Sequence, residues 1–70
     1  MKRRDLLKKI RTEAKRCQKN VTESEGGRHS KITVGNTSVR MPRHTVLNVD
    51  TARGIMQELE EEFGKGWWRL

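Results

Sequence analysis

The chain has 70 residues, a formal net charge of +7 and a hydrophobic content of 31%. This length leaves no room for a second domain, and a domain so small buries only about 60% of the surface that its unfolded chain exposes. One cysteine excludes an internal disulfide, and one cysteine with two histidines falls short of the usual ligand set of a structural zinc site. We therefore expect a small basic domain with no metal and no cofactor, attracted to polyanions.

Membrane contact is not expected. No stretch approaches the about 20 apolar residues of a membrane span. Asp5 and the basic residues at positions 8, 9 and 11 interrupt any apolar run behind the basic N-terminus, so the sequence does not resemble a signal peptide. The expected localisation is cytoplasmic.

The first predicted element is an amphipathic helix from about residue 3 to 17. Its apolar positions recur at spacings of three and four: Leu6, Leu7, Ile10, Ala14 and Cys17. Cys17 completes this stripe, and we assign it to the core rather than to a reactive thiol.

Most of the excess charge lies on this helix, since residues 1–20 carry nine positive and two negative charges. Arg4, Lys8, Arg11 and Lys15 are helix neighbours at spacings of three and four. They form one row, which could follow a phosphate backbone or could be a solvated helix face.

From residue 20 to 41 the period changes to two, which is typical of strands. The predicted strands are Val21–Glu23, Ser30–Val34 and Thr37–Met41. We expect Gly26-Gly27 and Gly35-Asn36 to form the two turns, and Pro42 to end the third strand because it lacks an amide donor.

A second amphipathic helix is predicted from about residue 49 to 63, with Ala52, Ile55, Met56, Leu59 and Phe63 on its apolar face. Asn48 is the expected N-cap and Gly64 the expected stop. Gly54 inside the helix predicts a close approach to the sheet. Residues 65–70 form a tail too short for an element of its own.

The predicted fold is α+β with the order α-β-β-β-α, in which residues 1–64 form one domain. It would have a three-stranded antiparallel sheet with both helices on one face, as in double-stranded-RNA-binding domains. The expected core is Leu6, Leu7, Ile10, Ala14, Ile32, Val34, Val39, Met41, Ile55, Met56, Leu59 and Phe63.

Two features near the C-terminus indicate a further contact. Glu58, Glu60, Glu61 and Glu62 crowd the end of the second helix, where the helix dipole disfavours negative charge. A basic surface on the first helix or on a second molecule would compensate them. Trp67 and Trp68 would either fold back over the core or form a hot spot for another protein or for self-association.

Four segments together resemble the HicA family of bacterial toxins, also called YcfA-like proteins. They are Gly27-Arg28-His29, the hairpin Lys31–Val39, the segment Met41-Pro42-Arg43-His44, and Asn48–Ile55 at the start of the second helix. Residues 3–63 can be laid along the family pattern, in which a Gly-x-His motif enters the second strand and a Thr-x-Arg-x-Ile motif opens the last helix.

The resemblance implies a type II toxin, an endoribonuclease that cleaves mRNA and is held in check by a HicB-type antitoxin. The family's catalytic histidine corresponds to His29 and its glycine turn to Gly27. RNA carries its own nucleophile, the 2′-hydroxyl, so a histidine acting as acid or base needs no metal.

Cations near the histidine would bind the scissile phosphate, and the candidates are Arg28, Lys31, Arg40 and Arg43. If the turn pairs Val34 with Thr37, His29 lies opposite position 42, and His44 becomes a candidate second acid or base. Glu23 and Glu25 could repel phosphate from this site, orient His29, or belong to an edge that a partner covers.

Two other functions remain open. One is a noncatalytic RNA- or DNA-binding module of the same fold, which would bind RNA in a salt-sensitive manner without cleaving it. The other is a scaffold whose basic helix binds an acidic protein.

Overall fold

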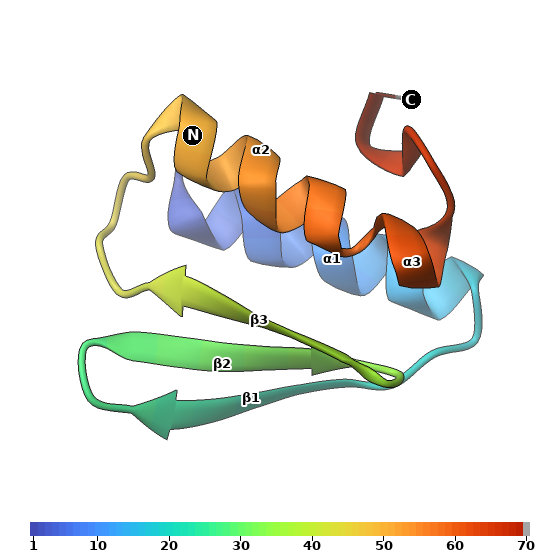
Figure 1. Cartoon of the computed structure of the whole chain (residues 1–70), viewed down its shortest axis with the longest axis horizontal. Helices are drawn as coiled ribbons and strands as arrows, with labels where there is room; N and C mark the ends of the chain where they lie inside the picture. The colour runs from blue at the N-terminus through green and yellow to red at the C-terminus, as the bar shows by residue number, and fades with distance from the viewer. Residues whose placement is uncertain (70) are drawn as a thin grey trace.

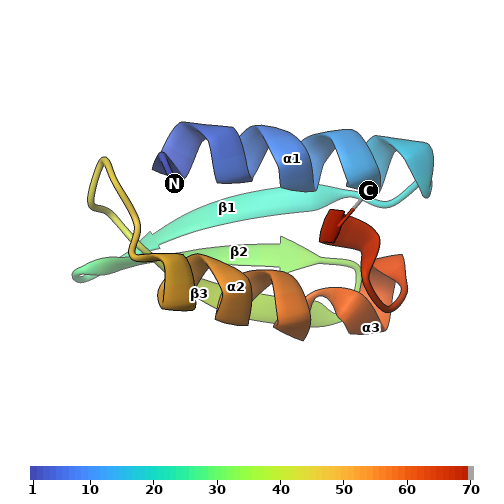
Figure 2. The ribbon, with the colours of Figure 1, turned by 90° about the horizontal axis from the view of Figure 1, so that it is seen from above.

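The computed structural model describes residues 1–69, and its helices and strands follow the predicted α-β-β-β-α order. The elements are α1 (Arg3–Arg16), β1 (Val21–Gly26), β2 (His29–Val34), β3 (Thr37–Pro42), α2 (Val49–Glu58), α3 (Glu60–Phe63) and the short 3-10 helix η1 (Trp67–Arg69). The strands form one antiparallel sheet in the order β1-β2-β3. Both long helices lie on one face of this sheet, α1 towards β1 and α2 along β3 (Figure 1, Figure 2). The α+β class is therefore confirmed.

The predicted helix ends are confirmed where local signals determine them. Asn48 caps α2, because its side-chain oxygen accepts a hydrogen bond of 2.7 Å from the amide of Asp50. Gly64 follows α3 with a φ of 98°, a conformation that side chains disfavour. Lys15 and Arg16 lie in the last turn of α1, where positive charge is favourable.

The two hairpins differ in how well the sequence predicts them. Val34 pairs with Thr37 across the second turn, as predicted, and Gly35 there has a φ of 57°. The predicted first turn at Gly26-Gly27 is wrong, because Gly26 still belongs to β1 and pairs with His29. The turn is Gly27-Arg28, with Gly27 at a φ of 54°, so β1 also extends three residues beyond the predicted Glu23.

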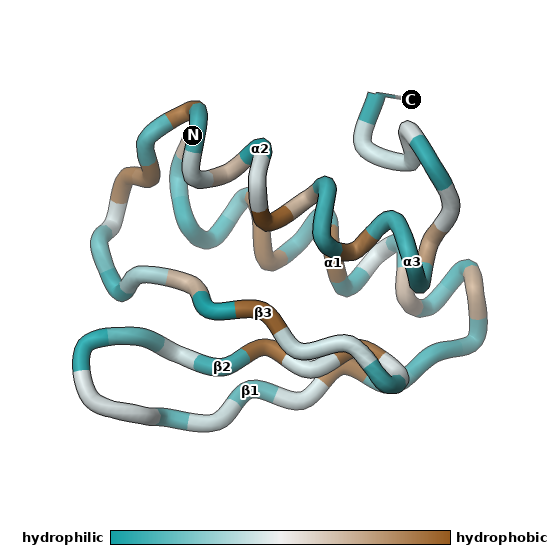
Figure 3. Tube along the Cα trace, in the orientation of Figure 1, coloured by the Kyte–Doolittle hydropathy of each residue, from teal (hydrophilic) through white to brown (hydrophobic). Residues whose placement is uncertain are grey.

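The core lies between the sheet and the two helices, and all twelve predicted core residues are buried. Figure 3 shows apolar residues along β2 and β3 and on the helices, whereas β1 is largely polar. Leu47, Ala52 and Trp67 are buried with the predicted core. Cys17 is only half-buried and packs against the edge of this core, so its assignment to the interior is confirmed in part.

The second helix differs from its prediction in two respects. It does not run unbroken from 49 to 63, because it is interrupted at Leu59 between α2 and α3. Gly54 does not mark a close approach to the sheet, since a Cβ built there has no heavy atom within 4 Å. Nothing in the structure explains a glycine at this position.

The prediction that residues 65–70 are too short for an element of their own is wrong, because residues 67–69 form the 3-10 helix η1. The Trp67 side chain folds back on the core, and its Nε1 donates a hydrogen bond of 2.9 Å to the carbonyl of Met56. Its ring meets that of Phe63 edge to face at 4.8 Å between centroids. Trp67 therefore folds back over the core, which is one of the two alternatives predicted for the tryptophans.

One glutamate at the acidic end of the second helix, Glu62, is compensated within the chain. Glu62 accepts hydrogen bonds of 2.9 Å from Lys19, just beyond α1, and of 2.7 Å from Thr37 at the start of β3. These two bonds lower the pKa of the Glu62 carboxyl below its usual range. The carboxylate also lies against the second turn, since a Cβ at Gly35 would be 2.3 Å from Glu62 Oε1. Lys19 is therefore part of the basic surface that the sequence predicted for these glutamates.

The Arg3 guanidinium ties α1 to all three strands. Its Nη2 donates to Glu23 of β1 and to Ser30 of β2, both at 2.9 Å, and its Nε donates to the carbonyl of Pro42 in β3 at 3.0 Å. Ser30 is only 1% exposed, so this bond satisfies a hydroxyl that water does not reach. Backbone contacts reinforce the junction, because the Arg3 amide donates to the carbonyl of Thr45 at 2.9 Å.

Arg3→Ala should lower the free energy of unfolding by roughly 2–3 kcal/mol, since it removes the donor to the Ser30 hydroxyl and leaves Glu23 with only its longer contact to Arg11. Urea unfolding followed by circular dichroism measures this change. Arg4→Ala is the matched control, because the neighbouring Arg4 side chain is 80% exposed and should contribute less than about 0.5 kcal/mol. Equal stability of the two variants would contradict the role given to Arg3.

Candidate nucleic-acid interface

The sheet face away from the helices carries the predicted catalytic histidine. In β2, Ser30, Ile32 and Val34 are buried under the helices, so His29 and Lys31 point to the opposite, open face. The nine positions on this face are Thr22, Ser24, Gly26, His29, Lys31, Thr33, Ser38, Arg40 and Pro42. None of them is acidic. The open face is therefore a polar and cationic surface.

Two cations face each other on this surface. Lys31 and Arg40 are directly paired across β2 and β3. Like charges at such a position destabilise a sheet. Among residues 1–69, neither side chain has an ion-pair partner, and Arg28 in the adjoining turn has none either. An anion bound between Lys31 and Arg40 would relieve their repulsion.

His29 borders this pair of cations. His29, Arg28, Lys31 and Arg40 line the same depression, which has a volume of about 650 Å³ and is open to solvent. We call these four residues the open-face site. The arrangement places an imidazole where a bound phosphodiester would lie between cations.

The carboxylates of β1 do not lie at this site. Glu23 is opposite Ile32 and Glu25 is opposite Ser30, so both side chains are on the helix-covered face. Glu23 forms ion pairs with Arg3 at 2.9 Å and with Arg11 at 3.5 Å. The expectation that these glutamates repel phosphate from His29, or orient it, is therefore wrong. Alternation along β1 sends them to the other face of the sheet.

The Arg3 guanidinium holds the Glu23 carboxylate of β1 in its charged form. The hydrogen bond from Arg3 outweighs the effect of burial and lowers the pKa of Glu23 below its usual range. Glu25 is paired with Arg43 at the neighbouring end of the strand. Both acidic side chains of β1 are thus neutralised by cations on the helix side.

The second histidine is not brought to the site. Pro42 pairs with His29, as the predicted register requires. Beyond Pro42, however, Arg43 forms an ion pair with Glu25. His44 lies exposed in the loop before α2. Neither residue lines the depression beside His29. Only one imidazole is therefore present at the open-face site.

The basic row of α1 forms a separate surface. Arg4, Lys8, Arg11 and Lys15 are all exposed, and the ion pair of Arg11 with Glu23 places the row on the flank of α1 next to β1. The edge strand β1 therefore lies between this row and the open face. Seven of the eight predicted RNA-binding residues therefore form two groups on different sides of the molecule, and Arg43, which is paired with Glu25, belongs to neither.

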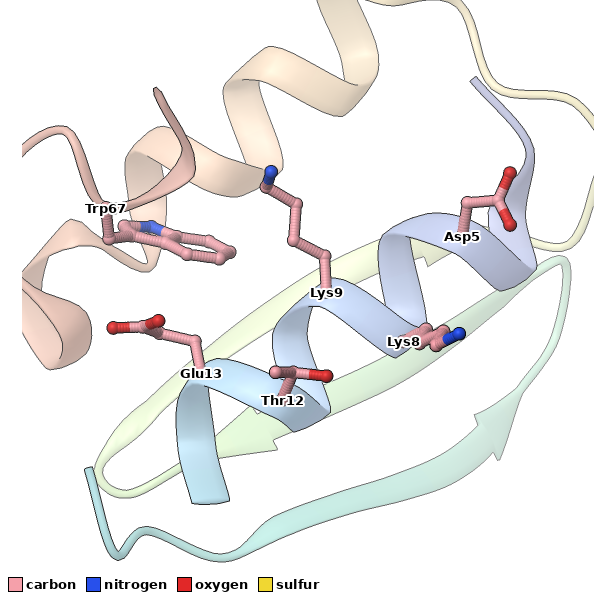
Figure 4. Close-up of a pocket in the computed structure, with 6 residues that line it drawn as sticks. All are labelled: Asp5, Lys8, Lys9, Thr12, Glu13 and Trp67. Carbon is pink, nitrogen blue, oxygen red and sulfur yellow. The ribbon is translucent and has the colours of Figure 1, made fainter. Parts of the chain in front are cut away.

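Another hollow lies between α1 and the C-terminal segment. Figure 4 shows Lys9 and Glu13 on α1 extending towards Trp67, with Asp5, Lys8 and Thr12 along the same helix. Its two carboxyl and two amino groups give the lining no net charge. This hollow therefore has no electrostatic preference for a polyanion.

Sequence patterns did not identify Arg3 and Ser30 as a structural pair behind the site. One signal was available, because Ser30 occupies an inward position in a strand whose other inward residues are Ile32 and Val34. A polar residue at such a position requires a hydrogen-bond partner. The identity of that partner depended on where α1 packs.

Glu23→Gln should lessen the loss of stability in acid. A carboxyl whose folded-state pKa is lowered stabilises the fold above its unfolded-state pKa, and this contribution disappears as the pH falls through the folded-state value. Between about pH 5 and pH 3, urea unfolding should show a steeper decline for wild type than for Glu23→Gln.

The matched control is Glu58→Gln, which removes an exposed carboxylate with no ion pair in the part of the chain that the structure describes. It should decline as steeply as wild type. A Glu23→Gln variant that did the same would rule out an acid-sensitive contribution from the Arg3–Glu23 pair.

Within residues 1–69, no helix is long and apolar enough to cross a membrane, and no three His, Cys, Asp or Glu side chains are grouped to hold a metal ion. Comparisons with protein-family models, with curated proteins and with solved structures find no significant match to this chain.

Proposed function

We propose that this protein is a metal-independent endoribonuclease of HicA type that cleaves mRNA at the open-face site. The observation that carries this proposal is the position of His29 beside Lys31 and Arg40, two facing cations without a carboxylate on their side of the sheet. The element order and the shared helix face resemble those of double-stranded-RNA-binding domains, which agrees with an RNA ligand.

The proposed reaction uses the nucleophile that RNA already contains. His29 accepts the proton of a 2′-hydroxyl, and the 2′-oxygen forms a bond to the adjacent phosphorus. The bond from phosphorus to the 5′-oxygen breaks, which leaves a 2′,3′-cyclic phosphate and a 5′-hydroxyl. Lys31 and Arg40 stabilise the negative charge that develops on the phosphoryl oxygens.

The leaving 5′-oxygen needs a proton from another source. His44 does not line the site, so water or the Lys31 ammonium group would deliver it. A single imidazole predicts slower cleavage than a pair of histidines would achieve, because one of the two proton transfers lacks a group with a suitable pKa.

The same observation favours a second candidate function. A surface with several cations and one histidine suits a noncatalytic RNA- or DNA-binding module as well as a nuclease. Such a module would bind RNA with strong salt dependence and leave it intact. Cleavage of RNA in the presence of EDTA separates the two functions.

A HicB-type antitoxin is the partner that the family resemblance suggests. An acidic protein surface placed over the open-face site would neutralise Lys31 and Arg40 and exclude RNA. Self-association through Trp67 and Trp68 stays a prediction, and Trp67 offers little surface for it because it is only 5% exposed.

His29→Ala should reduce RNA cleavage at least about 100-fold, because it removes the proposed acid/base group. The measurement is breakdown of a labelled RNA with EDTA present, together with growth arrest on induced expression. His44→Ala is the matched control, since it removes an imidazole outside the site and should retain cleavage. The proposal fails if folded His29→Ala cleaves as well as wild type.

A further inference from the structure

Apart from the His29 imidazole, the open-face site has no aromatic ring on which bases could stack. The chain contains only three aromatic residues of the Phe, Trp and Tyr types: Phe63, Trp67 and Trp68. Phe63 and Trp67 are buried in the core, and Trp68 is half-buried against it. All three lie in the helical layer, on the side of the sheet opposite His29. These rings therefore provide no stacking surface for bases at the site.

Apart from its cations, which can contact the O6 and N7 atoms of guanine, the open face has no side chains suited to identify a base. The nine positions contain no Asn, Gln, Asp or Glu, the residues that make characteristic contacts to adenine and cytosine edges. Thr33 Oγ1 and Ser38 Oγ are hydrogen-bonded to each other at 3.0 Å. Serine and threonine hydroxyls can in any case bond to a donor or to an acceptor on a base edge, so they do not distinguish the bases.

The cations of the site suit the phosphate groups of a nucleic acid, which are the same at every nucleotide. Arg28, Lys31 and Arg40 line one depression without acidic partners, so phosphate oxygens are the groups that they would bind best. Any stacking of the Arg40 guanidinium on a base would be indifferent to sequence, because every base has a π face.

We infer that the open-face site binds the phosphodiester backbone of a single strand without discriminating among uracil, adenine and cytosine, and binds RNA and DNA of equal length equally well. The inference rests on the proposed function for its ligand class. RNA and DNA then differ at the site only in the cleavage step, since DNA lacks the 2′-hydroxyl nucleophile. We infer a single strand rather than a duplex, because in-line attack by the 2′-oxygen requires a backbone that can leave the A-form geometry.

The test measures fluorescence anisotropy with labelled strands of about 12 nucleotides. Homopolymers of uridine, adenosine and cytidine, and of deoxythymidine, are titrated with His29→Ala, which should bind RNA without cutting it. We expect dissociation constants within about threefold of one another. Wild-type protein titrated with deoxythymidine shows how much the His29→Ala change itself alters binding.

Salt dependence identifies the residues involved. Three phosphate contacts predict a slope of about −2 in a plot of log binding constant against log salt concentration. Lys31→Ala or Arg40→Ala, each made in the His29→Ala protein, should reduce this slope by about 0.7. Arg53→Ala is the control of equal charge change, because Arg53 is exposed on α2 in the helical layer, and it should leave the slope unchanged.

The outcomes separate this inference from the proposed function. A preference of more than about tenfold for one homopolymer, or for RNA over DNA, would overturn the inference even if wild type cleaves RNA. Equal binding of all strands by a wild type that leaves RNA intact would support the inference and refute the nuclease. An absence of binding to every strand would refute both.

Discussion

The fold depends on one guanidinium group that connects its two layers. Arg3 lies at the start of α1 and donates hydrogen bonds to Glu23, Ser30 and Pro42, one residue in each strand. A sheet with few apolar residues in β1 gains little from burial at that edge. The charged hydrogen bond from Arg3 to Glu23 connects α1 to the edge strand there.

The same contact determines the character of the open face. Because successive side chains of a strand alternate, recruiting Glu23 to the helix side also carries Glu25 to that side. Glu23 is thereby paired with Arg3 and Arg11 of α1, and Glu25 is paired with Arg43 in the loop after β3. His29, Lys31 and Arg40 are left on a face without negative charge, and the repulsion between the two facing cations is a cost that an anionic ligand would offset.

The proposed function follows from this separation of charges more than from the total charge of the chain. A net charge of +7 attracts many polyanions, but it does not say where they bind. The basic row of α1 accounts for much of that charge, yet it lies on the far side of β1 from the histidine. The open face has fewer cations, but they adjoin the only imidazole that could act on a bound strand.

Local patterns in the sequence determined the order of elements, the core and the register of β2 with β3, because periodicity, the turn at Gly35 and the cap at Asn48 act over a few residues. The tertiary structure alone decided contacts between distant segments. It placed Arg3 against the sheet, sent Glu23 away from the site and folded Trp67 onto the core. Such contacts depend on how the helices pack on the sheet, which no short stretch of sequence encodes.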